Sequence, residues 1–309
     1  MTALHAVPAP PEPRPDPRRF VTADGSALRV VGSGPADAPV TVVLVHCWMM
    51  DHESWDDVVS HLGPDVRVLR YDHRGHGRSV AAPPGTARIE QLADDLAELL
   101  ADRAPTGKLV LAGHSLGGMT IMALAERHPE LVRARVAGVA FVATSSGDLS
   151  SNTFGVPPKL FTAGQRIEAP VNRWLVRRDP RSRRYGTAVL RLVLFGRNPS
   201  RYDLARAAKQ FARSHPASMI GIRYSLYEHD RYHALAAFRD IPAVVLAGAV
   251  DVLTPVGHLA RIARALPDAD FVLFPRAGHM LPFERSAEVA ERIGGLLRAA
   301  ADRKARRHG

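Results

Sequence analysis

The residues best suited to chemistry centre on Ser115, in the pentapeptide GHSLG at residues 113–117. This pentapeptide matches the pattern G-x-S-x-G. It follows an apolar run, KLVLA at 108–112, and precedes a stretch that is apolar on nearly all sides, 116–127. In such a strand–turn–helix setting the serine hydroxyl is exposed on a tight turn. The two glycines permit the turn, because side chains there would collide with adjacent backbone. We interpret Ser115 as a nucleophile; the alternative is an ordinary glycine-rich turn.

A serine hydroxyl is a weak nucleophile until a neighbouring base removes its proton, and His279 is the candidate base. It lies in PRAGHMLPF, residues 275–283, directly after the apolar run DFVLFP. Loops at the carboxyl ends of parallel strands are where α/β sheets place their sites. The chain contains 14 histidines, so position has to decide among them. His114 adjoins the serine, and we interpret it as structural.

A carboxylate is also required, because it fixes the tautomer of the base and stabilises the imidazolium ion. Asp251 lies in the segment AGAVDVLTP that follows the apolar run PAVVLA, one loop before His279 in the chain. Asp148 is the alternative, although it lies where the chain is already leaving the predicted core. We prefer Asp251, which gives the chain order Ser115, Asp251, His279.

The elements that must position these residues read as a parallel sheet between helices. Short apolar runs alternate with amphipathic stretches, which is typical of βαβ units. Strands are predicted at 40–46, 66–71, 108–112, 136–143, 241–248 and 270–275. Helices are predicted at 88–103, at 116–127 and from Ser286 onward. The sequence therefore predicts an α/β fold with a mostly parallel central sheet flanked by helices.

Five regions follow from these patterns. Residues 1–17 are rich in proline and are predicted to form a disordered tail. Residues 18–143 and 241–302 form the α/β core, and 303–309 form a basic tail. Residues 144–240 have helical patterns broken by prolines, so we expect a helical cap, or lid, inserted into the core.

Four segments give the chain a resemblance to the α/β-hydrolase family: LVHCW at 44–48, RYDHRGHGRS at 70–79, LAGHSLGGM at 111–119, and AGAVDVLTP with PRAGHMLPF. The chain order of serine, aspartate and histidine is the order found in that family. The sequence is most similar to esterases and to cofactor-free haloperoxidase-type perhydrolases. Epoxide hydrolases and haloalkane dehalogenases share the fold, but they carry aspartate at the position of Ser115.

The resemblance implies an oxyanion hole, in which backbone N–H groups hold the negative oxygen of a reaction intermediate. In the family a His-Gly-x loop supplies one donor, which assigns the N–H of Trp48 here; the N–H of Leu116 is the second. Cys47 replaces the glycine of that loop. If the position required a positive φ, the cysteine would be strained. We interpret Cys47 as a buried packing residue, with a thiol near the site as the alternative.

A further polar cluster is interpreted as structural. Asp72, Arg74, Gly75 and Gly77 would form a tight turn anchored by a contact between carboxylate and guanidinium. The sequence has no HExxH motif, cysteine pair, G-x-G-x-x-G motif or P-loop. We therefore expect no metal and no cofactor.

The formal charge of +10 comes from one region. Residues 144–240 hold 17 Lys and Arg against 7 Asp and Glu, while the remainder balances at 24 against 24. One interpretation of this basic region is a solvated helix face. The alternative is a surface that docks an anionic substrate, an acyl-carrier protein or an anionic membrane surface. No nucleic-acid module is recognisable, so we expect no nucleic-acid partner. One cysteine and no signal peptide favour the cytoplasm.

The function expected is hydrolysis of a carboxylic ester, a lactone or a thioester, all small-molecule substrates, through an acyl-enzyme intermediate. One alternative is a non-hydrolytic enzyme on the same scaffold, such as an acyltransferase, a lyase or cyclase, or a C–C hydrolase. The other alternative is a ligand-binding receptor in which Ser115, Asp251 and His279 remain but no longer catalyse a reaction. The sequence does not specify the natural substrate or the oligomeric state.

Overall fold

The structure, a computed structural model, describes residues 16–149, 191 and 193–308. Its centre is an eight-stranded sheet in the order β1-β2-β4-β3-β5-β6-β7-β8. The strands are β1 (Arg19–Val21), β2 (Ala27–Ser33), β3 (Val40–Val45), β4 (Val68–Tyr71), β5 (Lys108–His114), β6 (Val136–Val142), β7 (Ala243–Gly248) and β8 (Asp270–Phe274). β2 runs antiparallel to β1 and β4, whereas the neighbours from β4 to β8 are parallel.

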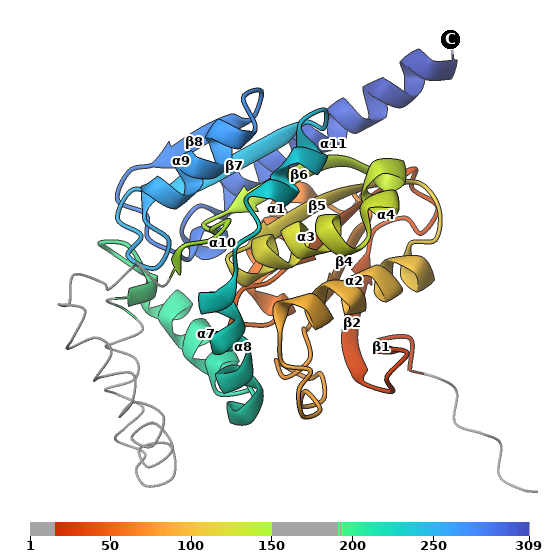
Figure 1. Ribbon diagram of the computed structural model, residues 1–309. Coiled ribbons are helices and arrows are strands. Elements are labelled where there is room, and N and C mark those ends of the chain that lie inside the picture. Colours follow the sequence, from red (N-terminus) through yellow and green to blue (C-terminus); the bar gives the residue numbers. More distant parts are fainter. Residues whose placement is uncertain (1–15, 150–190, 192, 309) are drawn as a thin grey trace, which may run out of the picture.

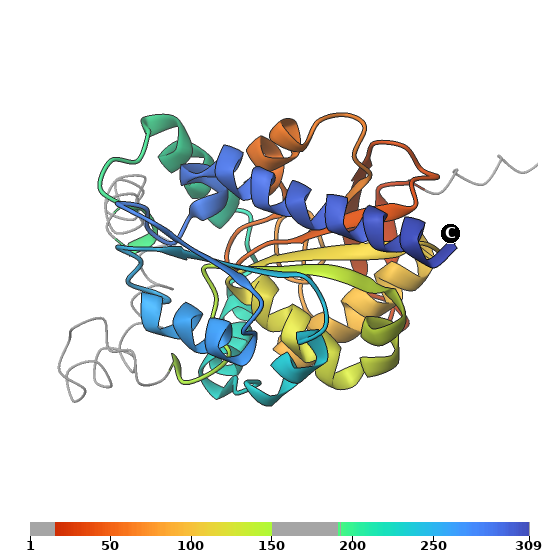
Figure 2. The same cartoon turned by 90° about the horizontal axis from the view of Figure 1, so that it is seen from above.

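Helices cover both faces of the sheet, as Figure 2 shows. One face carries α1 (Asp56–Leu62) and α11 (Ser286–His308), and the other carries α2 (Ile89–Arg103), α3 (Leu116–Arg127) and α9 (Val256–Ala265). The shorter elements are η1 (His52–Trp55), α4 (Pro129–Arg135) and α10 (Leu281–Glu284). No helix in the described ranges is long and apolar enough to cross a membrane.

The strand β3 shows how the sequence builds both layers. Its residues are β-branched or apolar, and all are buried. Because side chains alternate between the faces of a strand, Val43 and Val45 enter the cluster beneath α2 and α3, whereas Val42 and Leu44 enter the cluster beneath α11. A strand buried on both faces is apolar at nearly every position, which is the pattern that predicted it.

Between β6 and β7 the described part of the insertion is helical, with α7 (Arg201–Phe211), α8 (Pro216–Glu228) and η3 (His233–Phe238). α7 and α8 lie together at one end of the molecule (Figure 1). Arg206 of α7 pairs with Asp57 of α1 at 2.5 Å, and the Ser225 hydroxyl of α8 accepts the backbone N–H of Ile89 at the start of α2. The insertion therefore reaches elements on both faces of the sheet.

The predicted α/β architecture is confirmed, and every predicted strand is present with slightly different ends. The N-terminal strands β1 and β2 were not predicted. η3 lies inside the predicted cap, yet Leu235 and Phe238 pack in the main core. The predicted basic tail continues α11 to His308. Most of the predicted N-terminal tail, and residues 150–190 of the insertion, lie outside the described residues.

Candidate active site

Ser115 lies on the turn between β5 and α3 with φ 52° and ψ −113°, a conformation that is strained for a residue with a side chain. The turn is crowded on both sides. A Cβ atom at Gly113 would lie 2.5 Å from the backbone of Gly117, and one at Gly117 would lie 2.1 Å from the carbonyl oxygen of Val45. The close approach of β3 to the turn thus depends on glycine, as the sequence predicted.

Backbone contacts hold this strained residue in place. The Ser115 N–H donates to the carbonyl oxygen of Val142 at 2.9 Å, and the Thr144 hydroxyl donates to the Ser115 carbonyl oxygen at 2.6 Å. Both partners lie at or just beyond the end of β6. Ser115 itself is half-buried, whereas its neighbours His114 and Leu116 are fully buried. The serine is therefore the exposed point of an otherwise buried turn.

His279 and Asp251 are hydrogen-bonded to each other. The His279 Nδ1–H donates to Asp251 Oδ2 at 2.8 Å, and both side chains are almost completely buried. Asp251 follows β7, and His279 lies between β8 and α10. Because Nδ1 carries the proton in this bond, Nε2 is left as the basic atom of a neutral ring.

The Asp251 carboxylate has a full set of donors. Its Oδ1 accepts the backbone N–H groups of Leu253 and Thr254, and its Oδ2 also accepts the Thr254 hydroxyl at 2.7 Å. Burial acts to raise the pKa of Asp251, but His279 and the Thr254 donors outweigh it and lower that pKa below its usual value. The group is therefore a buried anion beside an imidazole.

His114 brings the loop of His279 next to the turn of Ser115. Its Nε2–H donates to the carbonyl oxygen of His279 at 2.8 Å, and the two rings lie 5.0 Å apart between centroids. Burial lowers the pKa of His114 to about 3, so this ring is neutral. Among the hydrogen bonds of the described residues, none joins the Ser115 hydroxyl to His279.

The alternative acid, Asp148, lies beyond the end of β6 with φ 66°. The carboxylate that His279 contacts is Asp251, and the structure brings these two residues together as we preferred from the sequence.

The loop 46–50 follows β3 and contains the predicted donor Trp48. Within the described part of the chain, no hydrogen bond uses the backbone N–H of Trp48 or that of Leu116. Both groups are thus free to bind an oxygen atom. The loop touches the serine turn, because Gly117 lies against the carbonyl oxygens of Val45 and His46.

Cys47 is not the strained residue of this loop. The positive φ, 63°, is at Met49, and Cys47 has an ordinary backbone conformation. Its side chain is 3% exposed and packs in an apolar cluster with Phe195 of the insertion and Met280. Burial raises the pKa of the Cys47 thiol far above its usual value. These observations agree with the packing interpretation.

The predicted contact between Asp72 and Arg74 is wrong, although both residues are buried. The Arg74 guanidinium binds Asp95 of α2 at 2.5 and 2.7 Å, and it binds Asp24 at 2.7 Å. Asp72 instead accepts N–H groups from His52 and Arg78. A buried guanidinium favours a carboxylate that can take two parallel bonds, and Asp95 offers that geometry.

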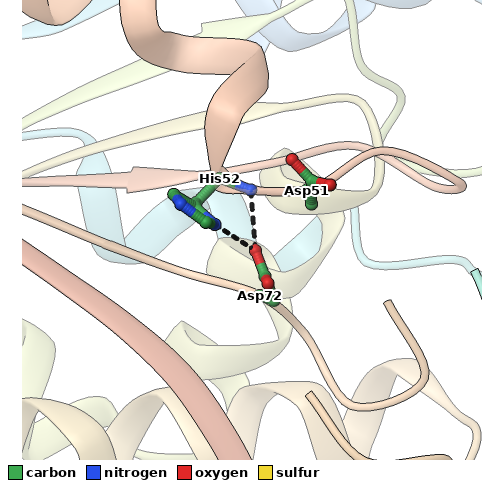
Figure 3. A group of neighbouring side chains, drawn as sticks. All are labelled: Asp51, His52 and Asp72. Atoms are coloured by element: carbon green, nitrogen blue, oxygen red, sulfur yellow. Dashed lines mark hydrogen bonds and ion pairs between the residues drawn. The ribbon is translucent and has the colours of Figure 1, made fainter. Parts of the chain in front are cut away.

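Asp51, His52 and Asp72 form a buried group whose oxygen and nitrogen atoms lie within 4.8 Å of one another, as a metal site would require (Figure 3). Both carboxylates already have partners within the protein. The backbone N–H and Nδ1 of His52 both bind Asp72 Oδ1, and the guanidinium of Arg213 lies 2.6 Å from Asp51 Oδ2. The group therefore fits a polar anchor between the insertion and the loop after β3 better than a metal centre.

Sequence reasoning missed Glu284 of α10. Its carboxylate accepts the backbone N–H of Gly278, next to His279, and that of Gly196 in the insertion. Burial raises the pKa of Glu284. A carboxylate shortly after the candidate base was a signal in the sequence, but its partner Gly196 could be found only from the structure.

Known proteins share this architecture. The sequence profile of the family described as alpha/beta hydrolase fold matches residues 40–286. The pimeloyl-acyl-carrier-protein methyl ester esterase of Chromobacterium violaceum is 30% identical over 257 residues, which cover 82% of this chain and 90% of the esterase.

Solved structures with a similar fold point to the same family. A thermophilic esterase from Thermogutta terrifontis is 26% identical, with a TM-score of 0.70 and coverage of 91% of this chain and 98% of that one. The enol-lactonase from Burkholderia xenovorans is 24% identical and shares the fold, with a TM-score of 0.71 and coverage of 90% and 99%. Since the family profile spans most of the sequence and these folds superimpose over nearly its whole length, the chain belongs to the α/β-hydrolase family.

Proposed function

We propose that this protein hydrolyses a carboxylic ester, a lactone or a thioester by a two-step route through an acyl-enzyme on Ser115. The observation that carries the proposal is the hydrogen-bonded pair of Asp251 and His279, which His114 holds next to the strained turn of Ser115. The similarity to a methyl ester esterase and to a solved esterase supports ester chemistry in particular.

In the first step Ser115 Oγ attacks the carbonyl carbon while His279 Nε2 takes its proton. Asp251 keeps the other ring nitrogen protonated, and it stabilises the imidazolium ion that forms. The carbonyl oxygen becomes an anion, which the N–H groups of Trp48 and Leu116 would bind. Each such donor contributes about 3–4 kcal/mol in enzymes from which one has been removed.

His279 then returns its proton to the leaving alcohol or thiol, which departs and completes the first step with the acyl group on Ser115. In the second step water attacks the acyl-enzyme while His279 takes its proton, and His279 returns that proton to Ser115 Oγ as the acid is released. In sites without substrate the bond between serine and histidine is often long and tightens only in the complex. The proposal therefore expects His279 Nε2 to approach Ser115 when substrate binds.

The insertion is proposed to be a cap that excludes water and shapes the substrate pocket. Its basic surplus favours an anionic partner, and an acyl-carrier protein is part of the substrate in the name of the Chromobacterium relative, so we favour an acyl chain on a carrier protein as the substrate. The densest arginine run, 177–184, lies outside the described residues, but Arg201 and Lys209 are exposed on α7. We also propose that the protein is located in the cytoplasm.

Ionic strength tests the charged partner. For an anionic or carrier-bound ester, kcat/KM should fall about tenfold between low and physiological salt, while kcat/KM for a neutral isostere changes little. Equal salt profiles would exclude an anionic substrate, and vesicle sedimentation would then test the membrane alternative.

Turnover of an activated short-chain ester tests the chemistry. Ser115→Ala should lower turnover by about 10⁴–10⁶ with folding intact, and His279→Ala should cost a similar factor. The double variant should lose little more, because the two residues act in one step. Substantial turnover by folded Ser115→Ala would contradict the proposal and favour a lyase or cyclase; turnover only with an added acyl acceptor would favour an acyltransferase.

A further inference from the structure

A short stretch of the insertion, residues 194–197, lies against the loop that carries His279. The backbone N–H groups of His279 and of the next residue both donate to the carbonyl oxygen of Leu194, at 2.9 and 3.1 Å. A third bond links the N–H of Arg197 to the carbonyl oxygen of Arg276 at 3.2 Å. The insertion thus binds the backbone of the candidate base directly.

Glu284 connects the 194–197 segment to the loop that carries His279. Its Oε2 accepts the N–H of Gly196 at 2.8 Å and that of Gly278 at 3.1 Å. Its Oε1 lies 3.1 Å from the same Gly278 nitrogen. One carboxylate therefore bridges the 194–197 segment and the residue immediately before His279.

The backbone of the 194–197 segment is also packed tightly against the backbone of the His279 loop. A Cβ atom at Gly196 would lie 2.0 Å from the carbonyl oxygen of Arg276 and 2.6 Å from Glu284 Oε2. Next to it, Gly278 lies against Gly248 at the end of β7, the strand that leads to Asp251. A side chain at Gly196 would have to push the segment away from the His279 loop.

We propose that Glu284 is a positioning residue that fixes the His279 loop against the 194–197 segment, so that the insertion holds the base in place as well as covering the site. The proposal rests on the proposed function, in which His279 is the base. A displacement of about 1 Å at a reacting group can cost about a hundredfold in rate. Loss of the bridge should therefore lower kcat more than it raises KM.

The test compares Glu284→Ala with Glu284→Gln, and uses Glu288→Ala as a matched control because Glu288 is exposed on the next helix. A glutamine can place its carbonyl oxygen where Oε2 lies and accept both N–H groups, but its amide nitrogen would then face the Gly278 N–H where Oε1 lies, so it keeps only part of the bridge. We expect Glu284→Ala to lower kcat by about 10–100-fold, Glu284→Gln to lower it less than Glu284→Ala does, and Glu288→Ala to leave it within about threefold. The rate at which a fluorophosphonate labels Ser115 should follow the same ranking, because labelling also needs the base.

Hydrogen exchange provides a readout that is independent of turnover. Exchange of the peptide covering 276–284 should speed up in Glu284→Ala, should speed up less in Glu284→Gln, and should remain unchanged in Glu288→Ala. Gly196→Ala disrupts the same contact between the 194–197 segment and the His279 loop, but from the insertion. It should therefore give the same loss of kcat. The double variant with Glu284→Ala should lose little more than either single one.

Three results would overturn the positioning role: unchanged kcat and exchange in Glu284→Ala, a loss of thermal stability with normal kcat per folded molecule, or full additivity of the two variants. Failure of the proposed function looks different. The unaltered protein would then not be labelled at Ser115, while the exchange result would still decide whether Glu284 joins the two segments.

Discussion

The turn of Ser115 and the loop of His279 are held in different ways. Around Ser115 the turn closes within one pentapeptide, where Gly113 packs against Gly117, and the adjacent strands β3 and β6 hold it through Val45, Val142 and Thr144. Around His279 the constraints come from several separate loops: Asp251, the carbonyl oxygen of Leu194, and the ring of His114. The turn of the proposed nucleophile is thus recognisable in its own pentapeptide and fixed by the neighbouring strands of the sheet, whereas the position of the proposed base depends on contacts with other loops and with the insertion. Substitutions far from the site should disturb the base more readily than the serine.

Among the substitutions that test this comparison, the largest effect is expected at the partner of the base. Asp251→Asn should lower kcat by about 10³–10⁴, because an amide favours the wrong histidine tautomer. Asp148→Asn, the matched control, should leave kcat nearly unchanged. Steady-state kinetics on a neutral ester measure both. The reverse ranking would transfer the role of the acid to Asp148.

The next effect tests how tightly the serine turn is packed against β3. Gly117→Ala should reduce the free energy of unfolding by about 3 kcal/mol, because its methyl group would overlap the carbonyl oxygen of Val45. Gly257→Ala in α9 is the control: its added methyl group meets no atom within 4 Å, so it should be neutral or stabilise by up to about 1 kcal/mol. Urea unfolding monitors both. A stable Gly117→Ala protein would show that the serine turn is not constrained by this contact.

The same contrast explains what the sequence could predict. The six predicted strands, the helix 116–127 and the turn of Ser115 follow from patterns within a few residues, and each is present. The partners of Arg74, the bridge from Glu284 to Gly196 and the pair of Asp51 and Arg213 join segments far apart in the chain. Such pairs form only after the sheet has brought the segments together, so no local pattern records them.

The smallest effect concerns the loop after β3. Burial and the neighbouring Asp72 raise the pKa of Asp51 to about 6 from its ordinary 3.8, although Arg213 opposes the shift. A carboxyl whose folded pKa is raised binds its proton more tightly in the folded state, so its contribution to stability falls as pH rises from about 4 to 6. Asp51→Asn does not titrate and can keep the N-cap bond to Glu53.

The difference in unfolding free energy, unaltered protein minus Asp51→Asn, should accordingly fall by about 1–3 kcal/mol between pH 4 and 7. Urea unfolding at a series of pH values measures it. A difference that rises with pH would mean that the ion pair with Arg213 outweighs burial, and that the insertion anchors this loop more firmly than the account allows.

The central claim, that Ser115 is the nucleophile and His279 its base, is tested most directly by covalent labelling. The protein is treated with a fluorophosphonate, digested, and mapped by mass spectrometry. The account predicts one adduct, on Ser115, formed at least about 10³ times more slowly in His279→Ala. An adduct on any other residue, or a rate that does not depend on His279, would contradict it.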